Sequence, residues 1–404
     1  MMSKLVPKLR FKEFSGDWEN KTLENLSNIT MGSSPKSSFY NKNKEGVPLL
    51  QGNADIKNRK SYPRIYTTQI TKECFENDIL LSVRAPVGTV AKSNHYACIG
   101  RGISSIKAKK DNSQEWIYQW FLQFENRWSS ISQGGTFEAV NSSDIKNLNI
   151  LIPKLEEQEK IAKTLTSLDN FIEVQNKKVE TLKKHKKGLM QKLFPLDGEK
   201  KPKLRFDGFS GDWEEKRLGD IVKVFKGKGI SKNDIIENGR LECIRYGELY
   251  TYYREIINDI KSKTNLNEDN LILSKKNDII IPSSGETSID IAIASCVTKD
   301  NIALGGDLNI LRGKENGIFL AYYLSNAKKY EIAKLAQGIA VIHLYASQLI
   351  NLNLKLPSID EQQKIAETLT SLDNLIEAQT KKVETLKQHK KGLMQKLFVN
   401  KEEN

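Results

Sequence analysis

Residues 160–194 read KIAKTLTSLDNFIEVQNKKVETLKKHKKGLMQKLF, and residues 364–398 repeat them as KIAETLTSLDNLIEAQTKKVETLKQHKKGLMQKLF. Only 5 of the 35 positions differ between the two copies. In each copy, apolar side chains recur at alternating steps of four and three residues, which is the heptad pattern of a coiled coil. Each copy therefore predicts one long helix with a narrow apolar seam. Such a seam must be covered by a partner helix. We expect each copy to be the partner of the other.

Two polar residues interrupt the predicted seam of each copy, Gln175 and Lys186 in the first and Gln379 and Lys390 in the second. Polar seam residues cost stability but restrict the register and the alternative assemblies of a coiled coil. Alternatively, these side chains reach solvent where the helices fray, and the pattern leaves both interpretations open. The predicted apolar interface residues are Ile161, Leu165, Leu168, Ile172, Val179, Leu182, Leu189, Leu193, Ile365, Leu369, Leu372, Ile376, Val383, Leu386, Leu393 and Leu397.

The flanking residues mark the ends of the helices. Pro153 and Pro357 disfavour helix upstream, acidic residues crowd the first turns, and Pro195 stops the first copy. A chain of 404 residues is too long for one ordinary core, so we expect two globular domains. The predicted segments are a domain at 1–153, a helix at 154–194, a linker at 195–206, a domain at 207–357 and a helix at 358–398.

A second repeat opens each half: PKLRFKEFSGDWE at 7–19 returns as PKLRFDGFSGDWE at 202–214. We expect its tryptophans, Trp18 and Trp213, to pack in the core. Between this motif and the helix, the two halves share only short motifs, such as Gln133-Gly134, which corresponds to Gln337-Gly338. Most other positions in these segments differ. The two halves therefore share a scaffold but differ in the segments between the repeated motifs, which we call the diverged fillings. This indicates one task carried out on two different targets.

The globular segments alternate short β-branched runs with Gly, Asn and Pro, which is typical of strands and turns. The order domain, helix, domain, helix allows the two helices to pair antiparallel. The sequence therefore predicts an α+β protein with a pseudo-twofold internal repeat, in which two mixed α/β domains are joined by two long antiparallel coiled-coil helices. Strands are expected at 26–30, 47–52, 78–83, 148–152, 221–225, 241–247, 278–283 and 352–356, and further helices near 115–124 and 319–334.

The composition bounds the class of partner. There are 63 Lys and Arg residues against 50 Asp and Glu, a formal net charge of +13, which suits a polyanionic partner. The four cysteines form no CxxC pair, and no secretory leader is visible. Because no apolar stretch approaches the roughly 20 residues that cross a bilayer, we expect a cytoplasmic protein without a membrane partner.

The sequence contains no recognisable catalytic constellation. No GxxxxGK[ST] loop, Asp-Pro-Pro-Tyr or Asn-Pro-Pro-Phe occurs, and the four histidines are scattered. Glu199-Lys200-Lys201 echoes a nuclease motif but lies in a polar linker without strand framing. We therefore predict no catalytic residues and no metal ligands.

Taken together, these features resemble the specificity (S) subunit of type I restriction-modification systems over essentially the whole chain. The resemblance rests on the duplicated opening motif, the Gln-Gly pairs and the Leu-Asn-x-x-x-Pro approach to each helix. It rests further on the pairs Glu157-Gln158 and Glu361-Gln362 and on the two KKGLMQKLF ends.

The resemblance implies a non-catalytic subunit whose two target recognition domains each read one half of an asymmetric bipartite site in double-stranded DNA. It also implies two DNA methyltransferase subunits docked on the helices, and separate restriction (motor-nuclease) subunits. The methyltransferase would bind and use S-adenosylmethionine, and the motor-nuclease would use ATP and Mg²⁺. This chain would bind no cofactor.

The alternative is a stand-alone bivalent DNA-binding regulator or scaffold. Exposed helix positions such as Thr181, Lys187 and Gln191 are repeated in both copies, which favours a docking surface for two copies of one partner. Recent duplication would leave the same identity, so the sequence does not separate the two readings.

Specific readout needs side chains that reach base edges, with further polar groups on phosphates. We expect these side chains in the diverged fillings, although an Arg or Tyr in such a loop can equally serve local packing. The DNA-binding candidates are Asn53, Lys57, Arg59, Lys60, Tyr62, Arg84 and Arg101 in the first domain, and Arg245, Tyr250, Tyr252, Arg254, Ser283, Ser284, His343 and Tyr345 in the second.

Overall fold

The structure is a computed structural model that describes residues 5–128, 139–339 and 341–399. The chain forms two compact units: unit 1 is Met1–Lys177 with Thr380–Asn404, and unit 2 is Lys178–Gln379. Each of the two long helices, residues 155–193 and 359–397, contributes residues to both units. The predicted landmark Gln133-Gly134 lies outside the described residues.

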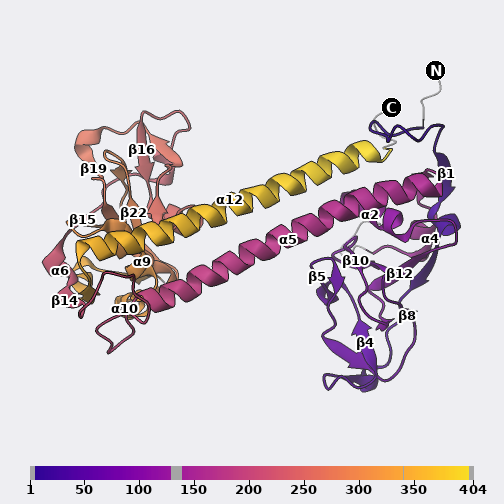
Figure 1. The fold of residues 1–404 in the computed structure, drawn as a ribbon, viewed down its shortest axis with the longest axis horizontal. Helices are drawn as coiled ribbons and strands as arrows, with labels where there is room; N and C mark the ends of the chain where they lie inside the picture. The colour runs from indigo at the N-terminus through magenta and orange to yellow at the C-terminus, as the bar shows by residue number, and fades with distance from the viewer. Residues whose placement is uncertain (1–4, 129–138, 340, 400–404) are drawn as a thin grey trace. The chain divides into compact units, whose positions relative to one another are not determined.

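Two sheets build the globular part of unit 1 (Figure 1). One has the strand order β2-β12-β9-β10-β6-β5 and the other β3-β7-β4-β11-β8, while β1 pairs with β13 apart from both. The apolar strand β9 is buried along its whole length, as expected of a strand covered on both faces. The elements are β1 (Glu19–Thr22), α1 (Leu23–Leu26), β2 (Ser27–Met31), η1 (Ser37–Phe39), β3 (Tyr40–Asn41), β4 (Val47–Leu50), η2 (Asn53–Asp55), β5 (Ile56–Lys57), β6 (Lys60–Ser61), β7 (Ile65–Thr67), β8 (Glu73–Cys74), β9 (Ile79–Ser82), β10 (Val90–Lys92), β11 (Ala97–Ile99), β12 (Ile103–Ala108), α2 (Gln114–Phe124), η3 (Glu125–Arg127), α4 (Ser142–Lys146) and β13 (Asn149–Ile152).

Helix α2 supplies the aromatic part of the unit 1 core. Its N-cap, Ser113, accepts a hydrogen bond from the backbone amide of Trp116. The Trp116 ring meets the edge of the Trp18 ring at 6.0 Å between centroids, which confirms the predicted packing of Trp18. Leu165 and Leu397, one from each long helix, belong to the same buried cluster, so the helix ends are built into the domain core.

Unit 2 repeats this plan, but its described residues form a five-stranded and a four-stranded sheet where unit 1 has six and five strands, and they add one further strand pair. Its sheets have the orders β15-β24-β20-β22-β17 and β18-β16-β23-β19, with the separate pairs β14-β26 and β21-β25. The elements are β14 (Glu214–Arg217), α6 (Leu218–Ile221), β15 (Val222–Lys226), η4 (Lys232–Asp234), β16 (Leu241–Ile244), α7 (Tyr246–Thr251), β17 (Ile256–Ile257), β18 (Ser262–Thr264), η5 (Glu268–Asn270), β19 (Ile272–Leu273), β20 (Asp278–Pro282), β21 (Ser284–Gly285), α8 (Ser288–Ile291), β22 (Ser295–Val297), β23 (Ala303–Leu304), β24 (Leu308–Gly313), α9 (Gly317–Ser325), α10 (Lys329–Leu335), β25 (Ile342–His343), α11 (Ala346–Leu349) and β26 (Asn353–Leu356).

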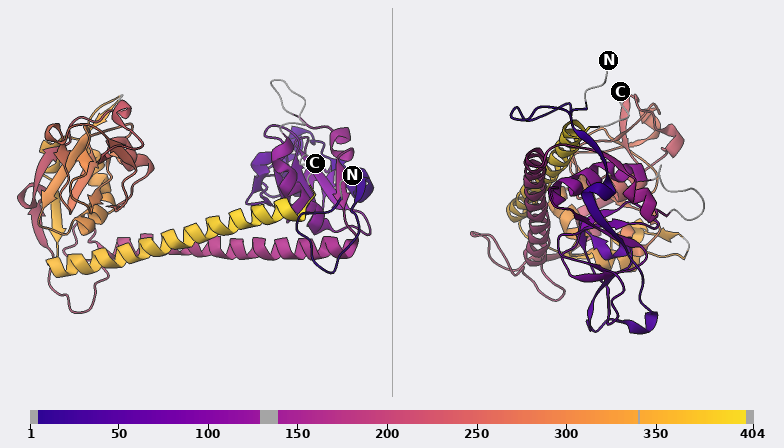
Figure 2. Two further views of the ribbon diagram at one scale, coloured as in Figure 1. Left: turned by 90° about the horizontal axis from the view of Figure 1, so that it is seen from above. Right: turned by 90° about the vertical axis from the view of Figure 1, so that its right-hand side faces the viewer.

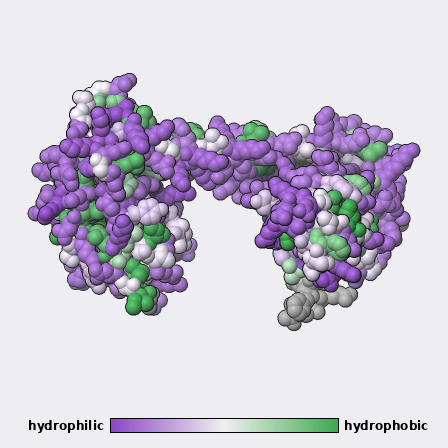
Figure 3. All heavy atoms as spheres, turned by 90° about the horizontal axis from the view of Figure 1, so that it is seen from below, coloured by the Kyte–Doolittle hydropathy of each residue, from purple (hydrophilic) through white to green (hydrophobic). Residues whose placement is uncertain are grey.

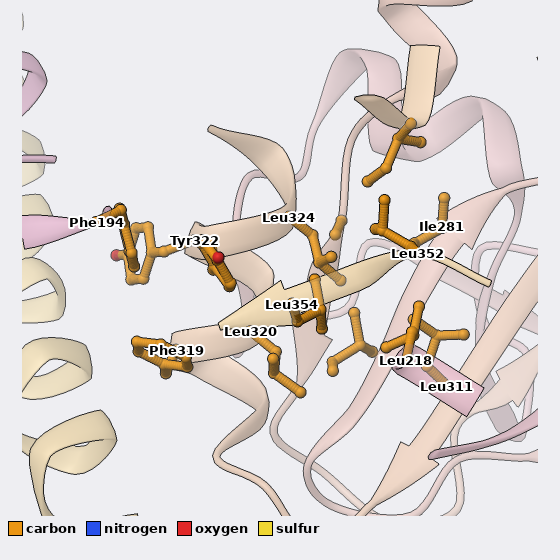
Figure 4. Packing of buried hydrophobic residues seen from close by; sticks show 14 of the residues in the cluster. Phe194, Leu218, Ile281, Leu311, Phe319, Leu320, Tyr322, Leu324, Leu352 and Leu354 are labelled. Carbon is orange, nitrogen blue, oxygen red and sulfur yellow. The ribbon is translucent and has the colours of Figure 1, made fainter. Parts of the chain in front are cut away.

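The core of unit 2 is centred on α9 (Figure 4). Phe319 faces Phe194, the residue that follows the first long helix, with 5.7 Å between the ring centroids. Leu320 and Leu324 lie on the other side of α9, toward Leu354 of β26. Trp213 packs against the Phe319 ring at 5.9 Å, which confirms its predicted place in the core.

The predicted long helices are α5 (Leu155–Leu193) and α12 (Ile359–Leu397). Within each unit they lie side by side and run antiparallel, as Figure 1 and Figure 2 show. This confirms the predicted fold class. The buried members of the predicted seam are Ile161, Leu165, Ile172, Val179, Leu193, Ile365, Leu369, Ile376, Val383 and Leu397. The half-buried members are Leu168, Leu182, Leu189, Leu372, Leu386 and Leu393.

Two local expectations are wrong. The helix predicted over 319–334 is broken in two, because the chain turns after Ser325 and the Asn326 side chain donates a hydrogen bond to the Tyr322 carbonyl at 2.8 Å. The strand predicted over 241–247 ends at Ile244, and helix α7 begins two residues later. There the Glu248 carboxylate accepts a hydrogen bond from the Arg245 backbone amide at 3.1 Å, which caps the helix.

Candidate nucleic-acid interface

The opening motif and the helix start are joined by a buried ion pair in each unit. In unit 1 the Arg10 guanidinium donates two hydrogen bonds, of 2.8 and 2.7 Å, to the Glu157 carboxylate. In unit 2 Arg205 does the same to Glu361, at 2.9 and 2.7 Å. Both glutamates are buried. The repeated Arg and Glu therefore have a structural task, which is to fix the opening segment on the first turn of each long helix.

The glutamine that follows each of these glutamates connects the long helix to the globular domain. The Gln158 side chain accepts a hydrogen bond from the Ser113 backbone amide at 2.9 Å and donates one to the Pro153 carbonyl at 2.9 Å. Gln362 makes the equivalent bonds to Asn316, at 3.0 Å, and to Pro357, at 3.1 Å. Since Ser113 and Asn316 are the N-caps of α2 and α9, the Glu-Gln pair ties each long helix to the main helix of its domain.

A buried lysine lies in the helix seam of unit 2. The Lys186 ammonium is 2.7 Å from the Asp373 carboxylate of α12 and 3.6 Å from Glu255 of the domain. It also lies 4.9 Å from the centre of the Tyr322 ring of α9. The Tyr322 hydroxyl donates a hydrogen bond to Asp373. Burial, and then Asp373, raises the pKa of Tyr322, so this donor keeps its proton.

Unit 1 has the equivalent lysine. The Lys390 ammonium lies 2.6 Å from both oxygens of the Asp169 carboxylate, and Gln119 of α2 donates a hydrogen bond to the same carboxylate at 2.8 Å. Burial lowers the pKa of Lys390, which Asp169 opposes. Lys186, Lys390 and Gln379 are buried in the seam, so the fraying interpretation is wrong for them. Each lysine–aspartate pair joins the two helices to one globular domain.

The DNA-binding candidates of the first domain gather on the β5–β6 hairpin. Asn58 and Arg59 form its two-residue turn, and both have positive φ, as a type I′ turn requires. The flanking Lys57 and Lys60 are exposed, and the Lys57 ammonium lies 5.1 Å from the centre of the exposed Tyr62 ring. These side chains form a basic and aromatic edge that is open to a polyanion.

The remaining candidates of unit 1 are placed differently. The Arg59 guanidinium forms a two-pronged ion pair with Glu125 and donates to the Val90 carbonyl at 3.1 Å. Glu125 raises the pKa of Arg59, and this pairing holds Arg59 against its own domain. Asn53 is half-buried, whereas Arg84 and Arg101 are exposed.

Several candidates of the second domain surround the short sheet of β21 and β25. Ser284 pairs with His343 in the register of this sheet. The Tyr250 hydroxyl donates a hydrogen bond to the Ser284 carbonyl at 2.8 Å. The exposed Tyr345 stacks on His343 with 6.1 Å between ring centroids. The structure therefore brings four sequence-predicted residues together around this sheet, three of them exposed and Ser284 buried.

The other second-domain candidates differ from this group in their burial and in their local contacts. Ser283 and Ser284 are buried, so their contribution to the surface is structural. Arg245 is half-buried and lies 3.7 Å from Glu248. Tyr252 and Arg254 are exposed. Ile339 and Val341, which precede His343, are exposed apolar residues that are not among the sequence-predicted candidates.

Figure 3 shows a surface that is mostly hydrophilic, with small apolar patches. Among residues 5–128, 139–339 and 341–399, no group of three or more His, Cys, Asp or Glu side chains is placed to hold a metal ion. Over the same ranges, no helix is both long enough and apolar enough to span a membrane.

Comparison with known proteins gives concordant results. The family model for the type I restriction modification DNA specificity domain matches residues 15–184 and again residues 210–388. Among solved structures, the type I restriction-modification S subunit from M. genitalium has a TM-score of 0.64 over 98% of this chain and 99% of that one, at 17% identity. This structural similarity shows that the two chains share their fold.

Three curated relatives come from Methanocaldococcus jannaschii. The chain is 30% identical to the type I restriction enzyme MjaVIII specificity subunit over 69% of this chain and 67% of that protein. It is 26% identical to the MjaIX specificity subunit over 94% and 92% of the two chains. The match to the MjaX specificity subunit is 39% identical but spans 47% of this chain and 45% of that protein. Because the family model covers both halves, this chain belongs to the family of type I restriction-modification DNA specificity subunits.

Proposed function

We propose that this chain reads an asymmetric bipartite DNA sequence and directs partner methyltransferase and restriction subunits to it. One observation carries the proposal: both units share the same junctions but differ on their candidate surfaces. The Arg–Glu pairs, the Glu-Gln ties and the lysine clamps recur in both halves. By contrast, the β5–β6 hairpin that carries Lys57 at the edge of its sheet in unit 1 is replaced at the same place in unit 2 by the single strand β17. One scaffold that carries two different readers matches a site with two different blocks.

The chemistry is assigned to the partners. S-adenosylmethionine would serve the methyltransferase, and ATP and Mg²⁺ the motor-nuclease. Two observations support this division. The sequence has no phosphate-binding loop or adenine methyltransferase motif, and family membership is that of a DNA specificity subunit. This chain contributes sequence recognition, a net positive charge for the DNA backbone and fixed positions for its partners.

The partner docking surface would lie on the long helices. Phe171 in unit 1 and Leu375 in unit 2 are equivalent by the repeat, and both are exposed apolar residues on helices whose seam is already filled. Val174, one helical turn after Phe171, is also exposed. Exposed apolar residues at matching positions of two repeats suit two copies of one partner.

Replacing Phe171 or Leu375 by aspartate should remove one docked methyltransferase each. A buried apolar anchor replaced by a charge costs about 2 kcal/mol or more of binding, which is roughly 30-fold in affinity. Titration calorimetry with the purified methyltransferase measures both the affinity and the stoichiometry. The matched control is Ile236→Asp, an exposed apolar residue of unit 2 outside the helices, which should leave two tight sites. Two tight sites in both helix variants would show that docking lies elsewhere.

The alternative function, a stand-alone bivalent DNA-binding regulator or scaffold, makes a different prediction. Selection from a random duplex library, with and without the methyltransferase, separates the two. Under the proposal the complex enriches two different short blocks around a spacer of fixed length, and the chain alone binds them much more weakly. Equal enrichment by the chain alone favours the regulator. Two identical inverted blocks would contradict the asymmetric site.

A further inference from the structure

A short β-ribbon stands next to the aromatic candidates of unit 2. Gln337 forms an antiparallel bridge with His343 of β25 (Ile342–His343), and Gly338, Ile339 and Val341 lie between these two residues. Gln337 and His343 exchange backbone hydrogen bonds in both directions, at 2.9 and 2.7 Å. Gly338 has φ +138°, and a Cβ at this position would lie 2.0 Å from the Val341 carbonyl oxygen. Only glycine allows the strands to approach this closely, so the narrow ribbon is specified by the sequence.

The ribbon presents apolar side chains where loops ordinarily carry polar ones. Ile339 is fully exposed, and the exposed fraction of Val341 is 52%. Both are β-branched and stiff at χ1, so each loses little conformational entropy when a partner covers it. Two such side chains at the tip of a ribbon indicate a contact surface rather than a solvated loop.

The base of the ribbon is anchored in the domain. β25 pairs with β21, and the backbone amide of the buried Leu344 donates a hydrogen bond to the Ser283 carbonyl at 3.0 Å. The buried Asn309 side chain donates to the Leu344 carbonyl, also at 3.0 Å. The Tyr250 hydroxyl is bonded to the adjoining strand at Ser284. This anchoring positions the tip before any partner binds, which lowers the entropic cost of recognition.

The surroundings of the tip fit DNA. The exposed side chains of His343 and Tyr345 flank it with hydrogen-bonding groups, and a two-stranded ribbon has the width that the major groove of B-DNA admits. The one apolar group on a base edge in that groove is the 5-methyl of thymine. We propose that this ribbon enters the major groove and that Ile339 and Val341 contact thymine methyl groups in the half-site read by unit 2. The inference rests on the proposed function and names the base feature that one reader uses.

The direct test removes only the methyl group. Duplexes that carry the selected site are prepared with uracil in place of each thymine in turn, and binding to the chain with its methyltransferase is measured. At least one thymine in one block should lose about fourfold in affinity, the value of one buried methyl-sized group. Uracil in the spacer should have no effect and is the control. Two blocks without any sensitive thymine would overturn the inference.

A second experiment tests whether Ile339 and Val341 are the residues that contact the thymine methyl group. In the double variant Ile339→Ser/Val341→Ser, the sensitive thymine and its uracil replacement should bind equally, because the partner of the methyl is gone. Ile236→Ser, in the same unit, should keep the fourfold difference. A uracil effect that persists in the double variant, or a variant that loses methyltransferase rather than DNA, overturns the inference. If the unaltered complex selects no bipartite DNA at all, the proposed function itself fails.

Discussion

Replacing Lys186 by methionine should lower the free energy of unfolding of unit 2 by about 3 kcal/mol, because Asp373 would remain in the seam without its cation. The Lys186 side chain is 11% exposed and that of Asp373 22% exposed, so water replaces the lost partner poorly. One oxygen of Asp373 already lacks a hydrogen bond among the described residues. Urea unfolding measures the loss, and hydrogen exchange of the α9 amides places it in unit 2.

The double variant Lys186→Met/Asp373→Asn serves as the control. It removes both charges of the ion pair, which is often nearly neutral, and the amide oxygen at position 373 still accepts the hydrogen bond from the Tyr322 hydroxyl, so this variant should recover to within about 1 kcal/mol of the unaltered protein. Lys390→Met is the matched change in unit 1, where Asp169 would be left uncompensated. A single Lys186→Met variant as stable as the unaltered chain would show that the clamp does not hold unit 2 together.

The second large effect is expected at the opening motif. Arg205→Ala should cost about 3 to 5 kcal/mol, because it leaves the buried Glu361 carboxylate without its guanidinium. The Glu361 side chain is 1% exposed and has two hydrogen bonds from Arg205. We expect the segment before Trp213 to detach from the first turn of α12, which limited proteolysis detects.

Lys203→Ala is the control for this change. Its side chain is 58% exposed and lies 4.0 Å from Glu199, and exposed pairs of this kind contribute about 0 to 1 kcal/mol. Arg10→Ala should reproduce the effect of Arg205→Ala in unit 1, since it uncouples Glu157. Equal stability of the Arg205 and Lys203 variants would contradict a structural task for the opening motif.

The long helices could be predicted from sequence because a heptad pattern is a local signal. Leu165 and Leu369 recur at fixed spacing, and nothing distant is needed to recognise them. The task of Lys186 was not predictable, because its partner Asp373 lies 187 residues away and only the antiparallel register brings them together. Arg10 and Glu157 were noticed as part of repeated motifs, but their pairing across 147 residues needed the fold.

The candidate interface was only partly predictable. Lys57, Lys60, Tyr62, His343 and Tyr345 are exposed, as a DNA contact requires. Arg59 was chosen by residue type, but its ion pair with Glu125 depends on helix η3 packing near the hairpin turn. The exposure of Ile339 could not be predicted, because an isoleucine is ordinarily buried in a core. Residue type suggests what a side chain can bind, whereas tertiary partners decide whether it is available.

The most direct measurement is single-molecule sequencing of genomic DNA from cells that contain the cognate methyltransferase, with and without this chain. The predicted result is methylated adenine at one asymmetric bipartite motif, present only with the chain. Arg205→Ala, which weakens one unit, should reduce methylation at that motif without creating a new one. Unchanged methylation with and without the chain, in cells where the complex is shown to assemble, would contradict its task as the sequence reader.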